Sequence, residues 1–354
     1  MLILKRFKLC HHLRSIRYLS SERKVVFSGI QPTGSIHLGN YFGAIQQWIR
    51  FQNDPSRHCI FSVVDLHSIT LTQEPEKLRQ HIRLLVASLL ACGIDAEKCI
   101  LFQQSSVTEH ALLCWVLGCL TTMSKLSFLP QYREKSANLK SIPFGIYVYP
   151  VLQTADIILY KSDEVPVGDD QWPHLNYARE LTEKFNYKFG KIFPIPKAII
   201  DKDSHSKRIK SLRNPEKKMS KSDSDPKSRI NLDDDSDAIR GKVMKAVTDH
   251  NSRVTFNLEE RPGVSNLLIL HSLTSGVPID KICEESSHLT TAEYKQVVAE
   301  CIIEHLTPIR KKLIEVLDDK LYVEEILRKG SLKANQIATT TMDEVKKAIG
   351  FSII

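Results

Sequence analysis

Short apolar runs that alternate with amphipathic stretches mark the first 200 residues of the chain. Buried strands are expected at five such runs: 25–30, 59–64, 99–103, 164–167 and 198–200. Strands that alternate with helices predict a doubly wound, Rossmann-like parallel sheet of the α/β class. Residues 121–145 interrupt the alternation, and we expect an inserted helical segment near 100–150. Almost every stretch after residue 230 has a helical pattern, which predicts a Rossmann-like domain over 24–230 and an all-helical C-terminal domain over 231–354.

Local signals predict several helix ends. Pro75 suits a first helical position, and Gly93 suits the C-terminal cap of the same helix. Pro150 is expected to open a helix that reaches Tyr160. The pairs Ser106/Glu109 and Thr290/Glu293 have the spacing of capping boxes.

Charge is concentrated in two short segments of a chain whose formal net charge is +8. Residues 1–24 hold seven Lys/Arg and one Glu, and residues 202–229 hold ten Lys/Arg and four Asp/Glu. The basic, Arg- and Ser-bearing leader predicts a transit peptide over 1–23 and a mitochondrial matrix address. The second segment predicts a mobile Lys-rich loop over 201–229. This distribution argues against a broad nucleic-acid-binding face.

Composition supports neither a membrane protein nor a protein with a structural metal. No apolar run approaches the roughly 20 residues of a membrane-spanning helix, so no membrane partner is expected. The eight cysteines include no Cys-x-x-Cys pair, so we expect no structural metal.

A glycine-bearing turn after the first strand has the composition of a phosphate site. Gly34 and Gly39 allow close backbone approach, and the helix start that follows offers free N–H groups. His37 and Asn40 are suited to donate hydrogen bonds to phosphoryl oxygens.

About 180 residues later, Lys218-Met219-Ser220-Lys221-Ser222 lies in the Lys-rich loop. A short Lys-x-x-Lys segment in a flexible, hydroxyl-rich loop can close over a polyphosphate. A solvated charge run is the alternative interpretation.

Tyr149, Gln153 and Asp156 are spaced to share one helix face. A carboxylate followed by Ile157, Ile158 and Leu159 must be paired or hydrogen-bonded if it is buried. Asp156 is therefore either part of a structural cap or ion pair, or the acceptor for a substrate N–H.

The segments 37–40 and 218–222 together resemble the ATP-handling signatures of class I aminoacyl-tRNA synthetases. The stretches 27–34, 64–70 and 165–171 are similar to the tryptophanyl family, and the resemblance runs from about residue 24 to the C-terminus. It implies that the chain joins L-tryptophan and ATP, with Mg²⁺ carried on the phosphates, into tryptophanyl-adenylate. The amino acid would then pass to tRNA(Trp).

The resemblance also assigns residues. The implied catalytic residues are His37, Asn40, Lys135, Lys218 and Lys221. The implied ATP-binding residues are Gln31, Thr33, Gly34, Gly39, Asn40, Gly168, Asp169, Asp170, Lys218, Met219, Ser220, Lys221 and Ser222. The implied tryptophan-binding residues are Phe27, His67, Tyr149, Gln153, Asp156, Val165, Val167 and Gln171. The family further implies a homodimer formed through the inserted segment, and anticodon binding by residues 231–354.

Three alternatives remain open at this point. Tyrosyl-tRNA synthetases also use a Tyr-x₃-Gln-x₂-Asp helix, and bacterial tryptophanyl enzymes usually have Met where this chain has Gln153. A small-molecule adenylyltransferase shares the His-x-Gly element without needing a long helical C-terminus. A catalytically silent RNA-binding paralogue would need neither Lys218 nor Lys221.

Overall fold

A five-stranded, all-parallel sheet forms the centre of the computed structural model, which describes residues 23–136, 139–168, 172–199 and 209–351. Its spatial order is β3-β2-β1-β4-β5. The strands are β1 (Lys24–Ile30), β2 (Arg57–Val63), β3 (Ile100–Gln103), β4 (Glu164–Pro166) and β5 (Lys197–Ile199). This is the doubly wound arrangement that the alternating pattern predicts, and the predicted fold class is confirmed.

The strands are apolar on both faces because helices cover both. Successive residues of β1 point to opposite sides, so Val26 and Phe27 belong to two different cores. The core that contains Val26 extends into helices of the C-terminal region. The core that contains Phe27 forms the back wall of the cavity described below.

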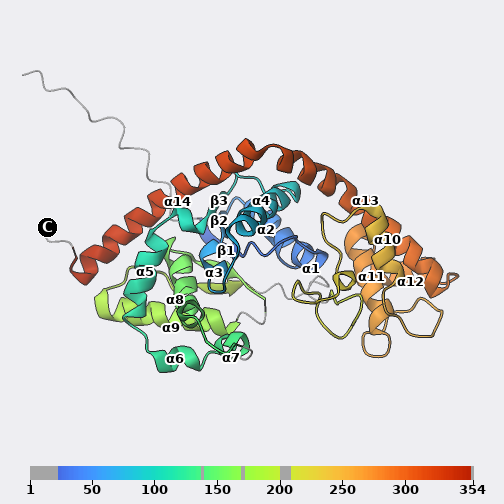
Figure 1. Cartoon of the computed structure of the whole chain (residues 1–354), viewed down its shortest axis with the longest axis horizontal. Helices are drawn as coiled ribbons and strands as arrows, with labels where there is room; N and C mark the ends of the chain where they lie inside the picture. Colours follow the sequence, from blue (N-terminus) through green and yellow to red (C-terminus); the bar gives the residue numbers. More distant parts are fainter. Residues whose placement is uncertain (1–22, 137–138, 169–171, 200–208, 352–354) are drawn as a thin grey trace, which may run out of the picture.

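Helices of the first 200 residues pack around the sheet (Figure 1). They are α1 (Leu38–Asn40), a π-helical turn (Tyr41–Ile45), α2 (Gln46–Gln52), α3 (Asp65–Ser68), α4 (Pro75–Ala91), α5 (Glu109–Gly118), α6 (Met123–Ser127), α7 (Pro130–Ser136), α8 (Phe144–Leu159) and α9 (Trp172–Phe189). The helices beyond residue 230 are α10 (Ser236–Met244), α11 (Pro262–Ser275), α12 (Ile279–Glu285), α13 (Thr291–Asp318) and α14 (Lys320–Ile349). Short 3₁₀ turns cover Gln104–Ser106 and Pro226–Ser228.

Some predicted helix ends are confirmed. Pro75 is the first residue of α4, and Gly93, just after that helix, has a left-handed φ of 108°. Thr290 and Glu293 form the predicted reciprocal capping box at the start of α13.

Two predicted helix starts are wrong. Ser106 lies in a 3₁₀ turn, and α5 begins at Glu109 after Thr108, so the pair makes no capping box. Pro150 does not open a helix but lies inside α8, which starts after the extended Pro143. Pro150 has no N–H and so removes one backbone hydrogen bond from α8, and the apolar packing of this helix offsets that loss.

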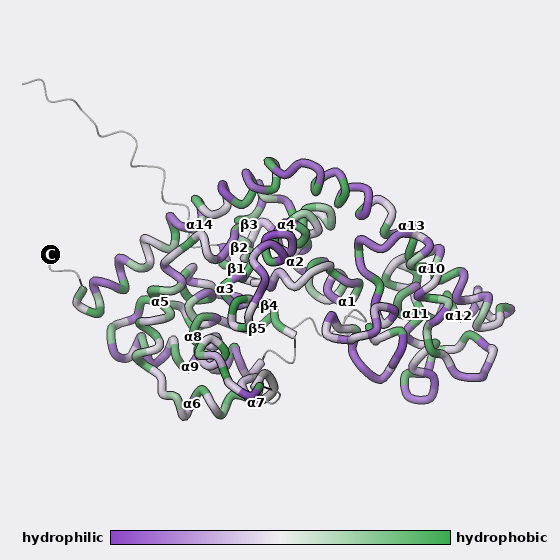
Figure 2. The backbone as a smooth tube through the Cα atoms, in the orientation of Figure 1, coloured by the Kyte–Doolittle hydropathy of each residue, from purple (hydrophilic) through white to green (hydrophobic). Residues whose placement is uncertain are grey.

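The long helices α13 and α14 form an arc across the molecule (Figure 1). α13 packs on α10 and α11, whereas α14 returns to β3, α5 and α8. Along α14 the tube alternates between hydrophilic and hydrophobic residues, as one buried face requires (Figure 2). At Gly330 an added Cβ would lie 1.8 Å from the carbonyl oxygen of Leu101, so only glycine permits this approach.

Within the described part of the chain, the helices are too short or too polar to cross a membrane. The domain boundary near residue 230 stays a prediction.

Candidate active site

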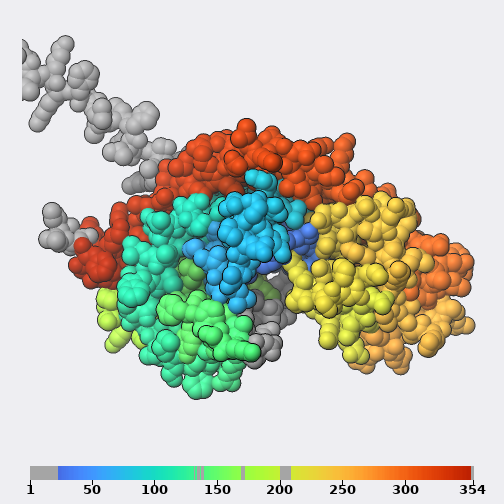
Figure 3. Space-filling model, in the orientation of Figure 1, coloured from blue at the N-terminus to red at the C-terminus, as the bar shows by residue number. Residues whose placement is uncertain are grey.

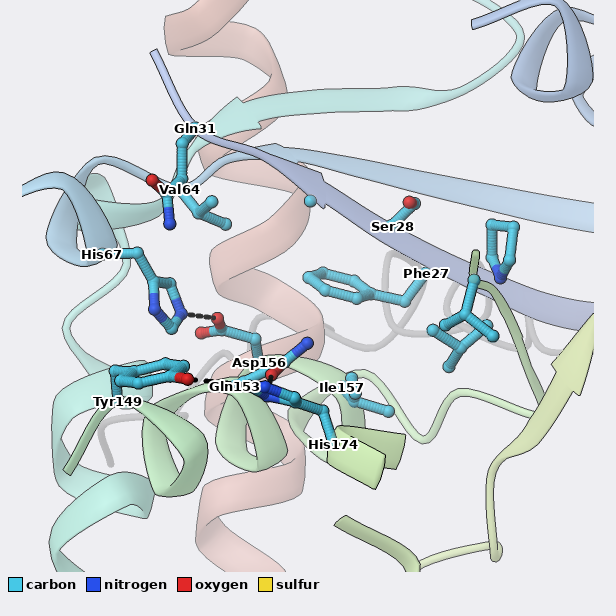
Figure 4. A pocket seen from close by; sticks show the side chains of 14 residues that line it. Phe27, Ser28, Gln31, Val64, His67, Tyr149, Gln153, Asp156, Ile157 and His174 are labelled. Carbon is cyan, nitrogen blue, oxygen red and sulfur yellow. Dashed lines mark hydrogen bonds and ion pairs between the residues drawn. The ribbon is translucent and has the colours of Figure 1, made fainter. Parts of the chain in front are cut away.

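A cavity of about 290 Å³ opens at the carboxyl ends of β1 and β4 (Figure 4). The strand order reverses between these two strands, and open α/β sheets bind ligands at such a point. The cavity is lined by Phe27, Ser28, Gly29, Gln31, Val64, His67, Tyr149, Gln153, Asp156, Ile157, Val165, Pro166, Val167 and His174. Figure 3 shows the surface hollowed between the part of the molecule around α6 and α7 and the part around residues 210–250.

The cavity gathers the predicted amino-acid site. Seven residues assigned there by resemblance line it: Phe27, His67, Tyr149, Gln153, Asp156, Val165 and Val167. Gln31 lines it as well. The eighth, Gln171, lies outside the described residues, as do Asp169 and Asp170 of the predicted ribose-binding turn. Gly168 directly follows the cavity-lining Val167.

Asp156 is only 2% exposed and accepts three hydrogen bonds. Gln104 Nε2 and His110 Nδ1 each lie 2.7 Å from Oδ1, and His67 Nε2 lies 2.8 Å from Oδ2. Burial opposes ionisation, but hydrogen bonds from His110 and His67 outweigh it and hold the pKa of Asp156 well below its usual value. The two interpretations left open for Asp156 are therefore compatible, since it belongs to a buried network and also lines the cavity.

A second polar chain crosses the cavity. His174 Nδ1 lies 2.6 Å from Gln153 Oε1, and His174 Nε2 lies 3.4 Å from the Tyr149 hydroxyl. His174 enters from α9, and the sequence analysis did not identify it. The available signal was a histidine near the start of the long helix predicted after the strand at 164–167.

The Lys-rich loop packs against the glycine-bearing turn. Residues 209–211 and 217–219 form a short antiparallel ladder, with Met219 N donating to Ile209 O at 3.2 Å. Met219 is 2% exposed, and its Cβ lies 3.6 Å from the place of a Cβ added at Gly39. The described part of this loop is therefore anchored by a buried side chain.

Lys221 joins the Lys-rich loop directly to the glycine-bearing turn. Its Nζ lies 3.0 Å from Gly34 O and 3.3 Å from Thr33 Oγ1. Leu38 N also donates to Ile230 O at 2.9 Å. The two segments thus meet at one place, as their shared chemistry predicts.

His37 is a neutral donor in a cationic environment. Burial, then the charges of Lys221, Arg229 and Lys218, lower its pKa to about 3. Its Nδ1 accepts from Asn40 N at 3.3 Å, so the neutral ring carries its proton on Nε2. Arg229, which the sequence analysis did not single out, is also a cause of this shift.

The remaining predicted ATP-binding residues make fewer contacts between the loop and the turn. Asn40 Oδ1 is buried and has no hydrogen-bond partner in the described part of the chain. Ser220 and Ser222 are bonded to each other, Oγ to Oγ at 2.8 Å. The backbone of Lys135 lies in α7, and its side chain is outside what the structure describes. Among the described residues, no group of three or more His, Cys, Asp or Glu side chains is arranged to hold a metal ion.

Known proteins resemble this chain over most of its length. The model of the family "tRNA synthetases class I (W and Y)" matches residues 20–318. The tryptophan–tRNA ligase of Caldanaerobacter subterraneus is 43% identical over 92% of this chain and 98% of its own length. The tryptophanyl-tRNA synthetase of Mycoplasma pneumoniae superposes with a TM-score of 0.83 at 31% identity, over 93% of this chain and 98% of that chain.

The corresponding structure from Campylobacter jejuni, complexed with ADP and tryptophan, superposes with a TM-score of 0.80 at 29% identity, over 92% of this chain and 99% of that one. The family model covers most of the chain, and the relative at 43% identity matches over nearly its own full length. The chain belongs to the class I tRNA synthetases, in the family of the tryptophanyl-tRNA synthetases.

Proposed function

We propose that the chain activates L-tryptophan with ATP to form tryptophanyl-adenylate and pyrophosphate, and then transfers the amino acid to tRNA(Trp). One observation carries this proposal: a cavity that holds a buried carboxylate opens at the end of β1, beside the turn where Lys221 and His37 meet. The relatives named tryptophan–tRNA ligase and the neighbour complexed with ADP and tryptophan support the same activity.

Tryptophan is the amino acid that suits the cavity. Phe27, Ile157 and Val165 offer apolar surface to an indole ring, and Asp156 offers a charged acceptor to its N–H. A site built to hydrogen-bond a substrate group rejects analogues without it by roughly 10⁴–10⁵-fold. Phenylalanine lacks that donor, and tyrosine carries its hydroxyl at a different place.

The lysine loop acts on the phosphates. In-line attack of the tryptophan carboxylate on the α-phosphate expels pyrophosphate, so negative charge grows on the leaving group. Lys218 and Lys221 stabilise this charge, and His37 donates a hydrogen bond from Nε2. No covalent enzyme intermediate is needed, because positioning and charge stabilisation supply the catalysis. Mg²⁺ enters on the ATP phosphates and adds charge neutralisation there.

A homodimer is part of the proposal. Large apolar side chains in the predicted inserted segment are exposed: Trp115 is 70%, Phe128 68% and Phe144 71% exposed. Burial of such side chains in an interface stabilises association. Light scattering of wild type and of Trp115→Glu tests this, since the charge should shift the mass towards the monomer.

The mitochondrial matrix is the proposed location, and residues 1–23 are the proposed transit peptide. The basic leader supports both. Fusion of residues 1–23 to a fluorescent protein should direct it to mitochondria, and a diffuse signal would contradict the proposal. The helical region beyond residue 230 is proposed to bind the tRNA anticodon.

The decisive experiment is amino-acid-dependent ATP–pyrophosphate exchange, followed by tRNA charging, with the full chain and with the chain lacking residues 1–23. Exchange that requires tryptophan and ends in charged tRNA supports the proposal. Exchange driven by tyrosine would favour a tyrosyl enzyme. Activation without charging would favour an adenylyltransferase, and absence of exchange a silent paralogue.

A further inference from the structure

The back of the Asp156 carboxylate is held by residues that do not line the cavity. Of its three hydrogen-bond donors, only His67 reaches the cavity wall, while Gln104 and His110 are both fully buried behind it. Both of these bond Oδ1 at 2.7 Å. Three elements therefore converge on one carboxylate: the turn after β3, α5 and α3.

The orientation of the Gln104 amide is determined by its other partner. Leu66 N donates to Gln104 Oε1 at 3.0 Å, so the NH₂ group must be the end that faces Asp156. Leu66 belongs to α3, which also carries His67. Gln104 thus fixes both the carboxylate and the helix that holds its third donor.

Asp156 selects one tautomer of His110. Nδ1 lies 2.7 Å from the Asp156 carboxylate, which only accepts, so the neutral imidazole carries its proton on Nδ1. Nε2 then accepts from the Tyr160 hydroxyl 2.8 Å away, and burial, which raises the pKa of Tyr160 well above 10, keeps that hydroxyl protonated. The hydrogen bonds therefore run in one direction, from Tyr160 through His110 to Asp156.

A carboxylate oxygen accepts about two hydrogen bonds. Gln104 and His110 occupy both places on Oδ1, whereas Oδ2 has only His67 among the described residues. In Figure 4 Asp156 extends from α8 towards His67, above Tyr149 and Gln153. The remaining acceptor position of the carboxylate is therefore on Oδ2, the oxygen paired with the cavity-lining histidine.

We propose that His110 and Gln104, with Tyr160 behind them, are positioning residues that set specificity for a substrate carrying a ring N–H. They occupy Oδ1, keep the carboxylate ionised and leave a single acceptor position for the ligand. The inference rests on the proposed function, because it concerns how tryptophan is selected.

Tyr160 links this selection to the shape of the cavity. Its ring stacks on Phe27, with centroids 5.6 Å apart and planes 10° from parallel. Phe27 lines the cavity and Tyr160 does not. The buried Tyr160 therefore supports both the apolar wall of the cavity, through Phe27, and the Asp156 carboxylate, through His110.

The test compares two substrates in ATP–pyrophosphate exchange with the full chain. One is L-tryptophan, and the other is 3-(benzothiophen-3-yl)-L-alanine, in which sulfur replaces the indole N–H. Wild type should prefer tryptophan by at least about 100-fold in kcat/KM, because the analogue leaves a buried acceptor unpaired.

His110→Leu should lower this preference at least about tenfold, mainly through the KM for tryptophan. The conservative His110→Asn places an amide N–H near the former Nδ1 and should restore most of the preference. His271→Leu is the matched control, because it removes another His–Tyr hydrogen bond, at 3.1 Å, remote from the cavity.

A pH profile supplies a readout that a merely structural role would not change. In wild type the KM for tryptophan should be flat from pH 6 to 8, whereas in His110→Leu it should rise as the pH falls. The titratable groups around Asp156 are His67 on α3, His110 and Cys114 on α5, Tyr149 and Tyr160 from α8 and its end, and His174 on α9. The profile of His110→Asn should return to the flat form.

Tyr160→Phe keeps the ring and removes only the hydroxyl, so it serves if His110→Leu fails to fold. It should lower the preference about two- to fivefold. Unchanged preference and a flat KM in both variants, or in Tyr160→Phe alone if His110→Leu does not fold, would overturn the inference. Wild type that shows no tryptophan-dependent exchange would instead overturn the proposed function.

Discussion

The two halves of the site treat charge in opposite ways. Asp156 has three donors from the protein and is compensated before any ligand arrives. Lys221, in contrast, donates hydrogen bonds to one carbonyl and one hydroxyl. In the described part of the chain it makes no ion pair, and Asp233 raises its pKa only from a longer distance. The difference suits the proposed ligands, since indole is neutral and cannot compensate a buried charge, whereas a triphosphate brings its own negative charge.

The largest loss of activity should come from the half of the site that contains Lys221. Lys221→Ala should lower the rate of adenylate formation by roughly 10³-fold, because it removes a charge that acts on the leaving group. Tryptophan affinity should change little. Single-turnover kinetics and equilibrium binding measure the two quantities, and Lys227→Ala, an exposed lysine of the same segment, is the control. Equal losses in rate and affinity would contradict the role.

The compensated half should show the reverse pattern. Asp156→Asn should lower kcat/KM for tryptophan about 100-fold, because the amide mismatches its donors and offers a weaker acceptor. The KM for ATP should stay within about twofold. Steady-state exchange measures both, with Asp95→Asn near the amino end of β3 as the control. A matching rise in the KM for ATP would remove the distinction between the halves.

The pH dependence of ATP binding should be a smaller effect. Burial, and then the charge of Arg229, lower the pKa of Lys221 to about 8. Because the charged amine binds phosphate, the KM for ATP should rise as the pH increases through about 8, and it should be about tenfold higher at pH 9 than at pH 6. Lys221→Arg, which stays charged, should give a flat profile. A wild-type profile that is flat from pH 7 to 9.5 would contradict the assignment.

Salt should produce the smallest difference. An increase in KCl from about 50 to 300 mM should raise the KM for ATP about twofold, since exposed cations are screened. The KM for tryptophan should not move, because Asp156 is buried among its partners. Exchange assays across the salt series at constant pH compare the two constants directly.

The sheet and the cavity wall could be predicted from the sequence because local residue patterns determine them. Val25–Phe27 and the run before Val64 have the apolar character of buried parallel strands. The spacing of Tyr149 and Asp156 places both on one face of α8 even though that helix begins earlier than Pro150 suggests. Helix periodicity does not depend on where the helix starts.

The residues that support Asp156 from behind could not be predicted in this way. Gln104, His110 and Tyr160 come from separate segments and meet only after the chain has folded. None lies in a motif, and each resembles an ordinary core or turn residue. Arg229 was likewise missed because a basic residue in a charged loop is usually solvated.

The contact between Gly330 and Leu101 has a consequence for biosynthesis. α14 supplies Ala334, Ala338 and Met342 to the same core that contains Phe27, so the wall behind the tryptophan cavity stays open until these residues leave the ribosome. The core on this side of the amino-terminal sheet is therefore completed only once α14 has been synthesised. A late stop codon would uncover this core rather than shorten a tail.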